Sequence, residues 1–136
     1  MRALLATMTL ALLTGTALAA PIPVVASFSI LGDMVKEVGG DRVAVTTIVG
    51  PNADTHVYEP RPQDAAVLSG AQLFVINGLG FEGWFERLVE ATGFKGEVVT
   101  ASDGVVTHTM DEDGEKITDP HAWQSLKNGG LFGRGG

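Results

Sequence analysis

The side chains best suited to chemistry in this sequence are three histidines, His56, His108 and His121. The chain contains no cysteine, so disulfides, zinc–thiolate sites and a lipid-modified cysteine are excluded, and any metal site must use nitrogen and oxygen ligands. A lone loop histidine is usually solvated surface. Metal binding therefore requires that the fold bring a second histidine to the first.

His56 stands in a stretch whose backbone is restricted. Three prolines lie within residues 51–62, Gly50-Pro51-Asn52 is typical of a turn, and Pro62 suits the first turn of a following helix. The imidazole is therefore expected to be held in one direction. We expect the neighbouring Glu59 to sit near a bound ion without touching it.

His121 lies in the run Asp-Pro-His-Ala-Trp at residues 119–123, which predicts a capped helix start with Asp119 as the N-cap and Pro120 at the first helical position. One interpretation is a capped helix whose histidine is simply exposed. The other is a second metal ligand, with Asp119 both capping the helix and orienting the His121 ring.

Strand-like and helix-like patterns alternate along the chain. Strands are predicted at residues 22–26, 42–49, 72–76 and 97–100, and helices at 29–38, with Ser29 as cap, 62–69 and 82–92. This order predicts an α/β fold, a single lobe with a four-stranded, mostly parallel sheet flanked by helices. Ligands bind outside the carboxyl ends of such strands, and every histidine follows one of those ends.

Two segments suggest other functions. Residues 105–118 predict an exposed hairpin around an Asp-Gly turn, before the last short helix; its four acids lack the spacing of a calcium loop, and its role is open. Residues 78–83 satisfy G-x-G-x-x-G, with Asp103 further on, as in a dinucleotide site. Bulky Phe81 and acidic Glu82 disfavour a pyrophosphate there, so tight turns and close packing are the preferred interpretation.

Composition and the first residues indicate an exported domain. The 136 residues carry a net charge of −7 and no cluster of lysine or arginine, which fits one globular domain and argues against nucleic-acid binding. Residues 1–19 predict a signal peptide cleaved before Ala20, with no membrane insertion afterwards. We expect a periplasmic monomer.

Three motifs together resemble the N-terminal lobe of the zinc/manganese-type periplasmic solute-binding proteins of ABC importers. They are His-Val-Tyr-Glu-Pro-Arg-Pro at 56–62, Asn-Gly-Leu-Gly-Phe-Glu-Gly-Trp at 77–84, and the run at 119–123. The resemblance implies two α/β lobes joined by a rigid helix, with one metal ion held between them for delivery to a membrane permease. His56 and His121 match the first-lobe ligands, and His108 with the hairpin acids would collect metal.

The resemblance ends near residue 126. Residues 127–136 are glycine-rich and predicted not to form a helix, which divides the chain into a lobe at 20–126 and a non-family tail. We expect a truncated or frameshifted product that supplies only two of the four ligands a closed zinc site needs.

The function expected from these observations is binding of a divalent transition metal ion for ABC-type import, not catalysis. Two imidazoles favour zinc over the alternative, manganese. One different hypothesis is an exported metal-dependent hydrolase with Glu59 as general base, although no nucleophile or oxyanion pocket accompanies it. Another is a remnant without a function of its own.

Overall fold

The structure is a computed structural model that describes residues 19–132; the predicted signal peptide falls almost entirely outside them. The strands are β1 (Ile22–Phe28), β2 (Val43–Val49), β3 (Leu73–Ile76), β4 (Glu97–Thr100), β5 (Thr109–Glu112) and β6 (Glu115–Thr118). The α-helices are α1 (Ser29–Gly39), α2 (Pro62–Ser69), α3 (Phe85–Thr92) and α4 (Leu126–Phe132), and two short 3-10 helices are η1 (Gly40–Arg42) and η2 (Ala122–Gln124).

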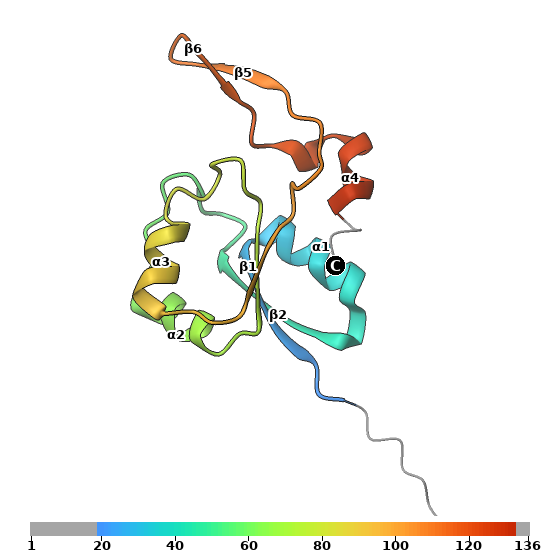
Figure 1. The fold of residues 1–136 in the computed structure, drawn as a ribbon, viewed down its shortest axis with the longest axis vertical. Coiled ribbons are helices and arrows are strands. Elements are labelled where there is room, and N and C mark those ends of the chain that lie inside the picture. Colours follow the sequence, from blue (N-terminus) through green and yellow to red (C-terminus); the bar gives the residue numbers. More distant parts are fainter. Residues whose placement is uncertain (1–18, 133–136) are drawn as a thin grey trace, which may run out of the picture.

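The first four strands form one parallel sheet in the order β2-β1-β3-β4. Helix α1 lies on one side of this sheet and α2 and α3 on the other (Figure 1). The predicted α/β class and four-stranded sheet are therefore confirmed. All four carboxyl ends meet at one edge of the sheet, where the loops that carry the histidines emerge.

The central strand β1 is apolar because both of its faces are covered, as is usual for parallel sheets. Its last five residues are all buried. On the side of α2 and α3 the core is filled by large side chains, with Phe74 and Leu68 fully inaccessible to solvent and Trp84 1% exposed. This core lies directly beneath the sheet, so it stabilises the strands whose carboxyl ends carry the loops.

Two predicted helix starts differ from the structure. Ser29 begins α1 but does not cap it, since Phe28 occupies the N-cap position without a side-chain hydrogen bond. Helix α3 begins at Phe85 and not at Glu82. The reason is local: residues 78–85 form successive turns, with Phe81 N–H donating to the Gly78 carbonyl at 3.1 Å. The Glu82 carboxylate accepts hydrogen bonds from Ser27 and Asn77.

The end of the described chain also corrects the sequence-based prediction. Asp119 does not start a helix at Pro120; the short 3-10 helix η2 begins at Ala122 with His121 at its N-cap. The prediction that residues 127–136 would not be helical is wrong as far as residue 132, because α4 covers Leu126–Phe132.

Tertiary bonds explain why a glycine-rich segment is helical. Each glycine costs a helix only about 1 kcal/mol relative to alanine. Asn128, 2% exposed, offsets that cost, since its Nδ2 donates to the Ala122 carbonyl at 3.2 Å and to the Val106 carbonyl at 3.4 Å. The helix is thereby fastened to the segments on either side of the hairpin.

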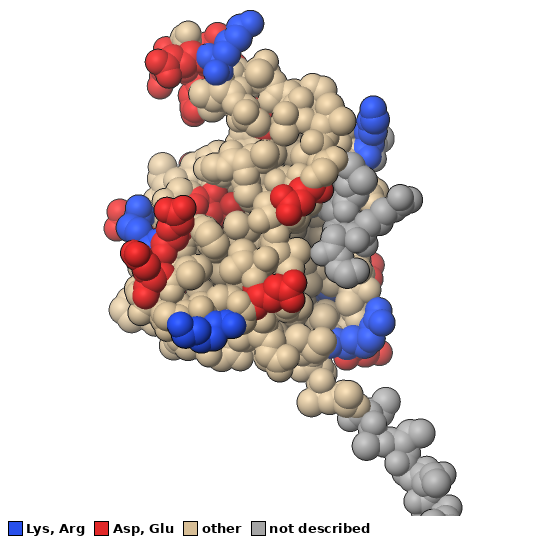
Figure 2. Space-filling view, viewed as in Figure 1, with Lys and Arg blue, Asp and Glu red and all other residues tan. Residues whose placement is uncertain are grey.

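Strands β5 and β6 form the predicted antiparallel hairpin, which projects from the sheet edge (Figure 1). Its turn has positive φ at both Asp113 (52°) and Gly114 (86°), as a tight hairpin turn requires. Figure 2 shows acidic side chains gathered at this projecting end. None of the helices in the described part of the chain has the length and apolar character that a membrane span requires.

Candidate metal site

His56 and His121 meet at the carboxyl edge of the sheet. His56 lies in the loop between β2 and α2, and His121 lies just after β6. Their Nε2 atoms are 3.4 Å apart, and both side chains line one open hollow of about 230 Å³. The fold therefore brings together two imidazoles that are far apart in sequence.

Each histidine is preceded, two residues earlier, by an aspartate that accepts its backbone N–H. Asp54 Oδ1 accepts from His56 N–H at 2.9 Å, and Asp119 Oδ1 accepts from His121 N–H at 2.9 Å. Both loops thus use the same Asp-x-His turn to present the imidazole. The repeat is visible in the sequence at residues 54–56 and 119–121. It would have identified Asp54, which the sequence-based prediction missed.

Asp119 also orients the His121 ring. His121 Nδ1–H donates to Asp119 Oδ1 at 2.8 Å, so the second ring nitrogen, Nε2, keeps its lone pair for the hollow. The pKa of Asp119 is lowered, first by the hydrogen bond from the His121 backbone N–H and then by the one from the ring. The aspartate is therefore ionised at neutral pH and remains an acceptor.

The carbonyl directly before each histidine is held by a buried donor. Trp84 Nε1–H donates to the Thr55 carbonyl at 2.9 Å, and Asn77 Nδ2 donates to the Pro120 carbonyl at 2.9 Å. Both donors belong to residues 77–84, which we call the 77–84 loop. This loop therefore contacts the backbone of both histidine segments. No sequence pattern predicted this role.

The 77–84 loop is itself built around a buried carboxylate. Glu82, 7% exposed, accepts hydrogen bonds from Ser27 Oγ at 2.6 Å, Asn77 N–H at 2.7 Å and Gly78 N–H at 3.1 Å. The glycine-rich turn thus directs its N–H groups at the chain's own carboxylate. A phosphate could not take that position, which agrees with the preference for a packing role over a dinucleotide site.

An aromatic cluster underlies the two imidazoles. Phe28, Phe81 and Trp123 contact one another with ring centroids 4.9 Å apart in each pair. His56 stands edge-on to Phe81 at 4.6 Å, and His121 lies 5.3 Å from Trp123. Phe28, Phe81 and Trp123 line the same hollow as the two imidazoles, and these contacts restrict the positions of both histidine rings.

The outer end of the His56 loop is closed by a second network. Asp64 Oδ2 accepts from the Tyr58 hydroxyl at 2.8 Å and from Arg61 N–H at 2.7 Å. Burial, and then the hydrogen bond to Asp64, raises the pKa of Tyr58. Neither Thr55 nor Tyr58 had a role predictable from sequence, and each now has one in fixing the loop.

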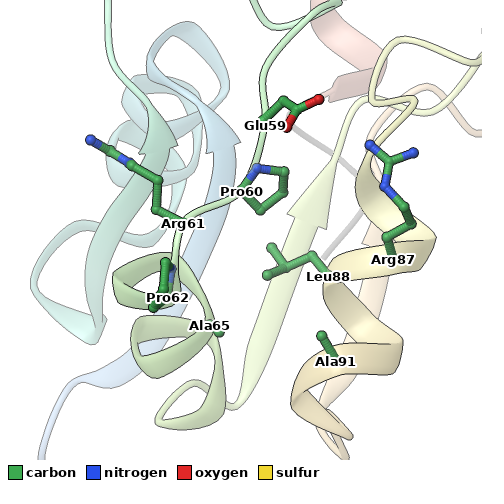
Figure 3. Close-up of a pocket in the computed structure, with 8 residues that line it drawn as sticks. All are labelled: Glu59, Pro60, Arg61, Pro62, Ala65, Arg87, Leu88 and Ala91. Atoms are coloured by element: carbon green, nitrogen blue, oxygen red, sulfur yellow. The ribbon is translucent and has the colours of Figure 1, made fainter.

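Two other predicted site residues do not line the histidine hollow. His108 has an exposed side chain, and its backbone carbonyl accepts from Asp119 N–H at 2.8 Å. Glu59 lies in a different hollow between α2 and α3, on the same side as Arg87, while Arg61 points away (Figure 3). Within residues 19–132, no three His, Cys, Asp or Glu side chains are grouped so as to hold a metal ion.

The distance between the two imidazoles suits a shared ion. Two nitrogens about 2.05 Å from one tetrahedral ion are separated by about 3.3 Å. The observed 3.4 Å is close to that value and lies at the outer limit of a hydrogen bond. The described residues therefore place two imidazole nitrogens at a separation that one shared ion would require.

A parallel α/β lobe with two imidazoles at its ligand edge is compatible with a domain of an ABC-type substrate-binding protein, the class to which the comparison with known families assigns this chain. Comparison with known families agrees: the chain belongs to the ZnuA family, zinc-uptake complex component A, periplasmic, whose model matches residues 24–132. The predicted resemblance is confirmed. This is a family of substrate-binding proteins and not of enzymes, as expected.

Individual relatives are named for different metals. The chain is 44% identical over 108 residues to the manganese-binding lipoprotein MntA of Halalkalibacterium halodurans, covering 79% of this chain and 35% of that protein. It is 36% identical over 129 residues to the iron ABC transporter substrate-binding lipoprotein MtsA of Streptococcus pyogenes serotype M1, covering 89% and 41%. A crystal structure of a zinc-bound ZnuA deletion mutant matches with a TM-score of 0.76 at 31% identity, covering 84% and 44%.

The chain spans between 35% and 44% of the length of these three relatives. The family assignment therefore applies to one lobe. The metal that a full-length family member binds is not thereby assigned to this chain.

Proposed function

We propose that this chain binds a divalent transition metal ion between His56 Nε2 and His121 Nε2, as part of metal delivery to an ABC-type import permease. The 3.4 Å separation of these two atoms is the observation that carries the proposal. Asp119 acts beside the ion through the His121 ring. Glu59 and His108 do not line the hollow, so any part they play is indirect.

Zinc is the proposed ion and manganese the alternative. Two neutral imidazoles suit a borderline metal better than a hard one, and the nitrogen separation suits tetrahedral coordination. Relatives named for manganese, iron and zinc leave this choice to the chain's own ligands. With two protein ligands, water or groups from outside the described residues complete the coordination, so binding is weaker than at a four-ligand site.

The cellular setting follows the same reasoning. We propose that residues 1–19 direct export, that the mature chain is a periplasmic monomer, and that the metal-loaded lobe is recognised by a membrane permease. The division into a lobe at 20–126 and a tail at 127–136 also stays a prediction. Cell fractionation, with mass spectrometry of the mature N-terminus, tests export and cleavage before Ala20.

Isothermal titration of the mature chain with zinc and with manganese tests the metal site. We expect His56→Ala and His121→Ala each to abolish measurable zinc binding. His108→Ala is the matched control, since it removes the third histidine without touching the hollow, and should bind as the parent does. Equal zinc affinity in the parent and both site variants would refute the proposal.

A further inference from the structure

We propose that Asn77 and Trp84 are positioning residues that separately set the places of His121 and His56, with the buried Glu82 carboxylate as their common support. This inference rests on the proposed metal site, because it explains what holds the two ligand nitrogens at one separation. It assigns a function to the 77–84 loop beyond packing.

The Trp84 indole holds the His56 segment in place. Trp84 is 1% exposed, and its N–H donates to the carbonyl of Thr55, itself 6% exposed and directly before His56 in the chain. A buried carbonyl without its donor is costly, so the Thr55–His56 peptide is held where the indole reaches it. Rotation of that peptide would carry the His56 ring with it.

The arm that holds His121 is the Asn77 amide. Asn77 is fully buried, and its Nδ2 donates to the carbonyls of Pro120 and Gly78, both at 2.9 Å. The amide cannot flip, since its oxygen would then face two carbonyl oxygens. Asn77 Oδ1 has no hydrogen-bond partner among the described residues, so the side chain is kept in place by what its nitrogen donates.

Glu82 gives both arms one reference point. Its carboxylate binds Ser27 on β1 as well as the N–H groups of Asn77 and Gly78. The start of the loop is therefore fixed to the central strand. Trp84 follows Glu82 by two residues in the chain. Asn77 and Trp84 are therefore both close in sequence to the same buried carboxylate, and each donates to the segment of a different histidine.

A purely structural role would make the same residues matter only for stability. The two interpretations differ in what each variant does to the individual rings. Positioning predicts that loss of the indole N–H disturbs His56 and that loss of the amide donors disturbs His121. A structural role predicts no ring-specific change in a variant that remains folded.

The first test uses the metal-free mature chain with isotope-labelled histidine, whose three ring signals are followed by NMR. Trp84→Phe keeps an aromatic ring and removes the N–H, so we expect the His56 signals to move. Asn77→Leu keeps a side chain of similar size and removes both N–H donors, so we expect the His121 signals to move; Asn77→Ala serves if the leucine variant does not fold. His108 is the internal reference and should not change.

The second test measures zinc affinity in the same variants by titration calorimetry. We expect the zinc affinity of each variant to be lower than that of the parent by a factor of about ten or more. Leu68→Ala is the control: it creates a cavity at a fully buried position of α2, outside the 77–84 loop and without a hydrogen bond to either histidine segment, and it should lower the melting temperature while keeping the parent's affinity.

These tests separate the two proposals. Folded variants with unchanged histidine signals and unchanged zinc affinity would overturn the positioning role while leaving the metal site in place. A parent chain that binds no zinc through its histidines would refute the proposed function, whereas the ring signals of the metal-free chain would still report on positioning.

Discussion

Asp119 Oδ1 accepts two hydrogen bonds from His121, one from the backbone N–H at 2.9 Å and one from ring Nδ1 at 2.8 Å. From His56, by contrast, Asp54 accepts the backbone N–H, and within residues 19–132 its carboxylate has no hydrogen bond to the His56 ring. Two aspartates at equivalent places in two Asp-x-His turns therefore have different consequences for the histidine that follows, and mutating both tests that difference.

We expect Asp119→Ala to weaken zinc binding by roughly 10- to 100-fold, because it releases the His121 ring as well as the turn. Asp54→Ala should have a smaller effect, since it loosens only the His56 backbone. Titration calorimetry of both variants measures the contrast. An equal loss in the two would show that the ring hydrogen bond adds nothing.

Glu82→Gln should destabilise the fold by about 1.5–3 kcal/mol. In the parent, both oxygens of the Glu82 carboxylate accept hydrogen bonds. Glutamine replaces one of these oxygens with an NH₂ group, which cannot accept. The loss of a hydrogen bond to a buried charge costs about 1.5–3 kcal/mol. Urea unfolding provides the measurement. Glu86→Gln, at an exposed position of α3, is the control and should lie within about 0.5 kcal/mol of the parent.

Tyr58 should titrate above its ordinary pKa of about 10. Burial and the hydrogen bond to Asp64 raise the pKa of this hydroxyl in the folded state. The stability that Tyr58 contributes is thus present below about pH 10 and is lost as the pH rises through the folded pKa. The chain has one tyrosine, so absorbance at 295 nm follows this group alone.

Asp64→Asn should bring that titration midpoint down towards the ordinary value, because the carboxylate no longer opposes the phenolate. Tyr58→Phe should show no transition at all. A midpoint in the parent at or below about 10 would contradict the burial of this hydroxyl.

The helical assignment of α4 leads to a stability prediction. A Cβ added at Gly129 meets no atom within 4 Å, so Gly129→Ala should stabilise the chain by about 0.5–1 kcal/mol if the segment is helical. Gly104→Ala is the contrasting variant, because Gly104 has a φ of +80° that alanine adopts only with strain. Thermal unfolding should show opposite shifts. No gain from Gly129→Ala would indicate that residues 126–132 are not helical in solution.

Several features of the fold could be predicted from local patterns alone. The alternation of apolar strands and amphipathic helices identifies the parallel sheet, and helix α2 and strand β4 begin and end where the patterns place them. Parallel strands share one carboxyl edge, so the meeting of His56 and His121 there could also be anticipated. These inferences succeed because they depend on periodicity and connectivity, which local sequence encodes.

Other features depend on contacts between distant segments. The helix at residues 126–132 is supported by the tertiary hydrogen bonds of Asn128, and Glu59 lines a hollow between α2 and α3 and not the one that holds the two histidines.

The amino-acid sequence by itself determined the α/β class, the exclusion of thiolate ligands and the two histidines that we propose as metal ligands. Only the tertiary structure decided that Trp84 and Asn77 hold the carbonyls before those histidines and that Glu82 occupies the glycine-rich turn. The physical reason is that a buried donor must find its acceptor in three dimensions, and the identity of that acceptor leaves no trace in the spacing of residues along the chain.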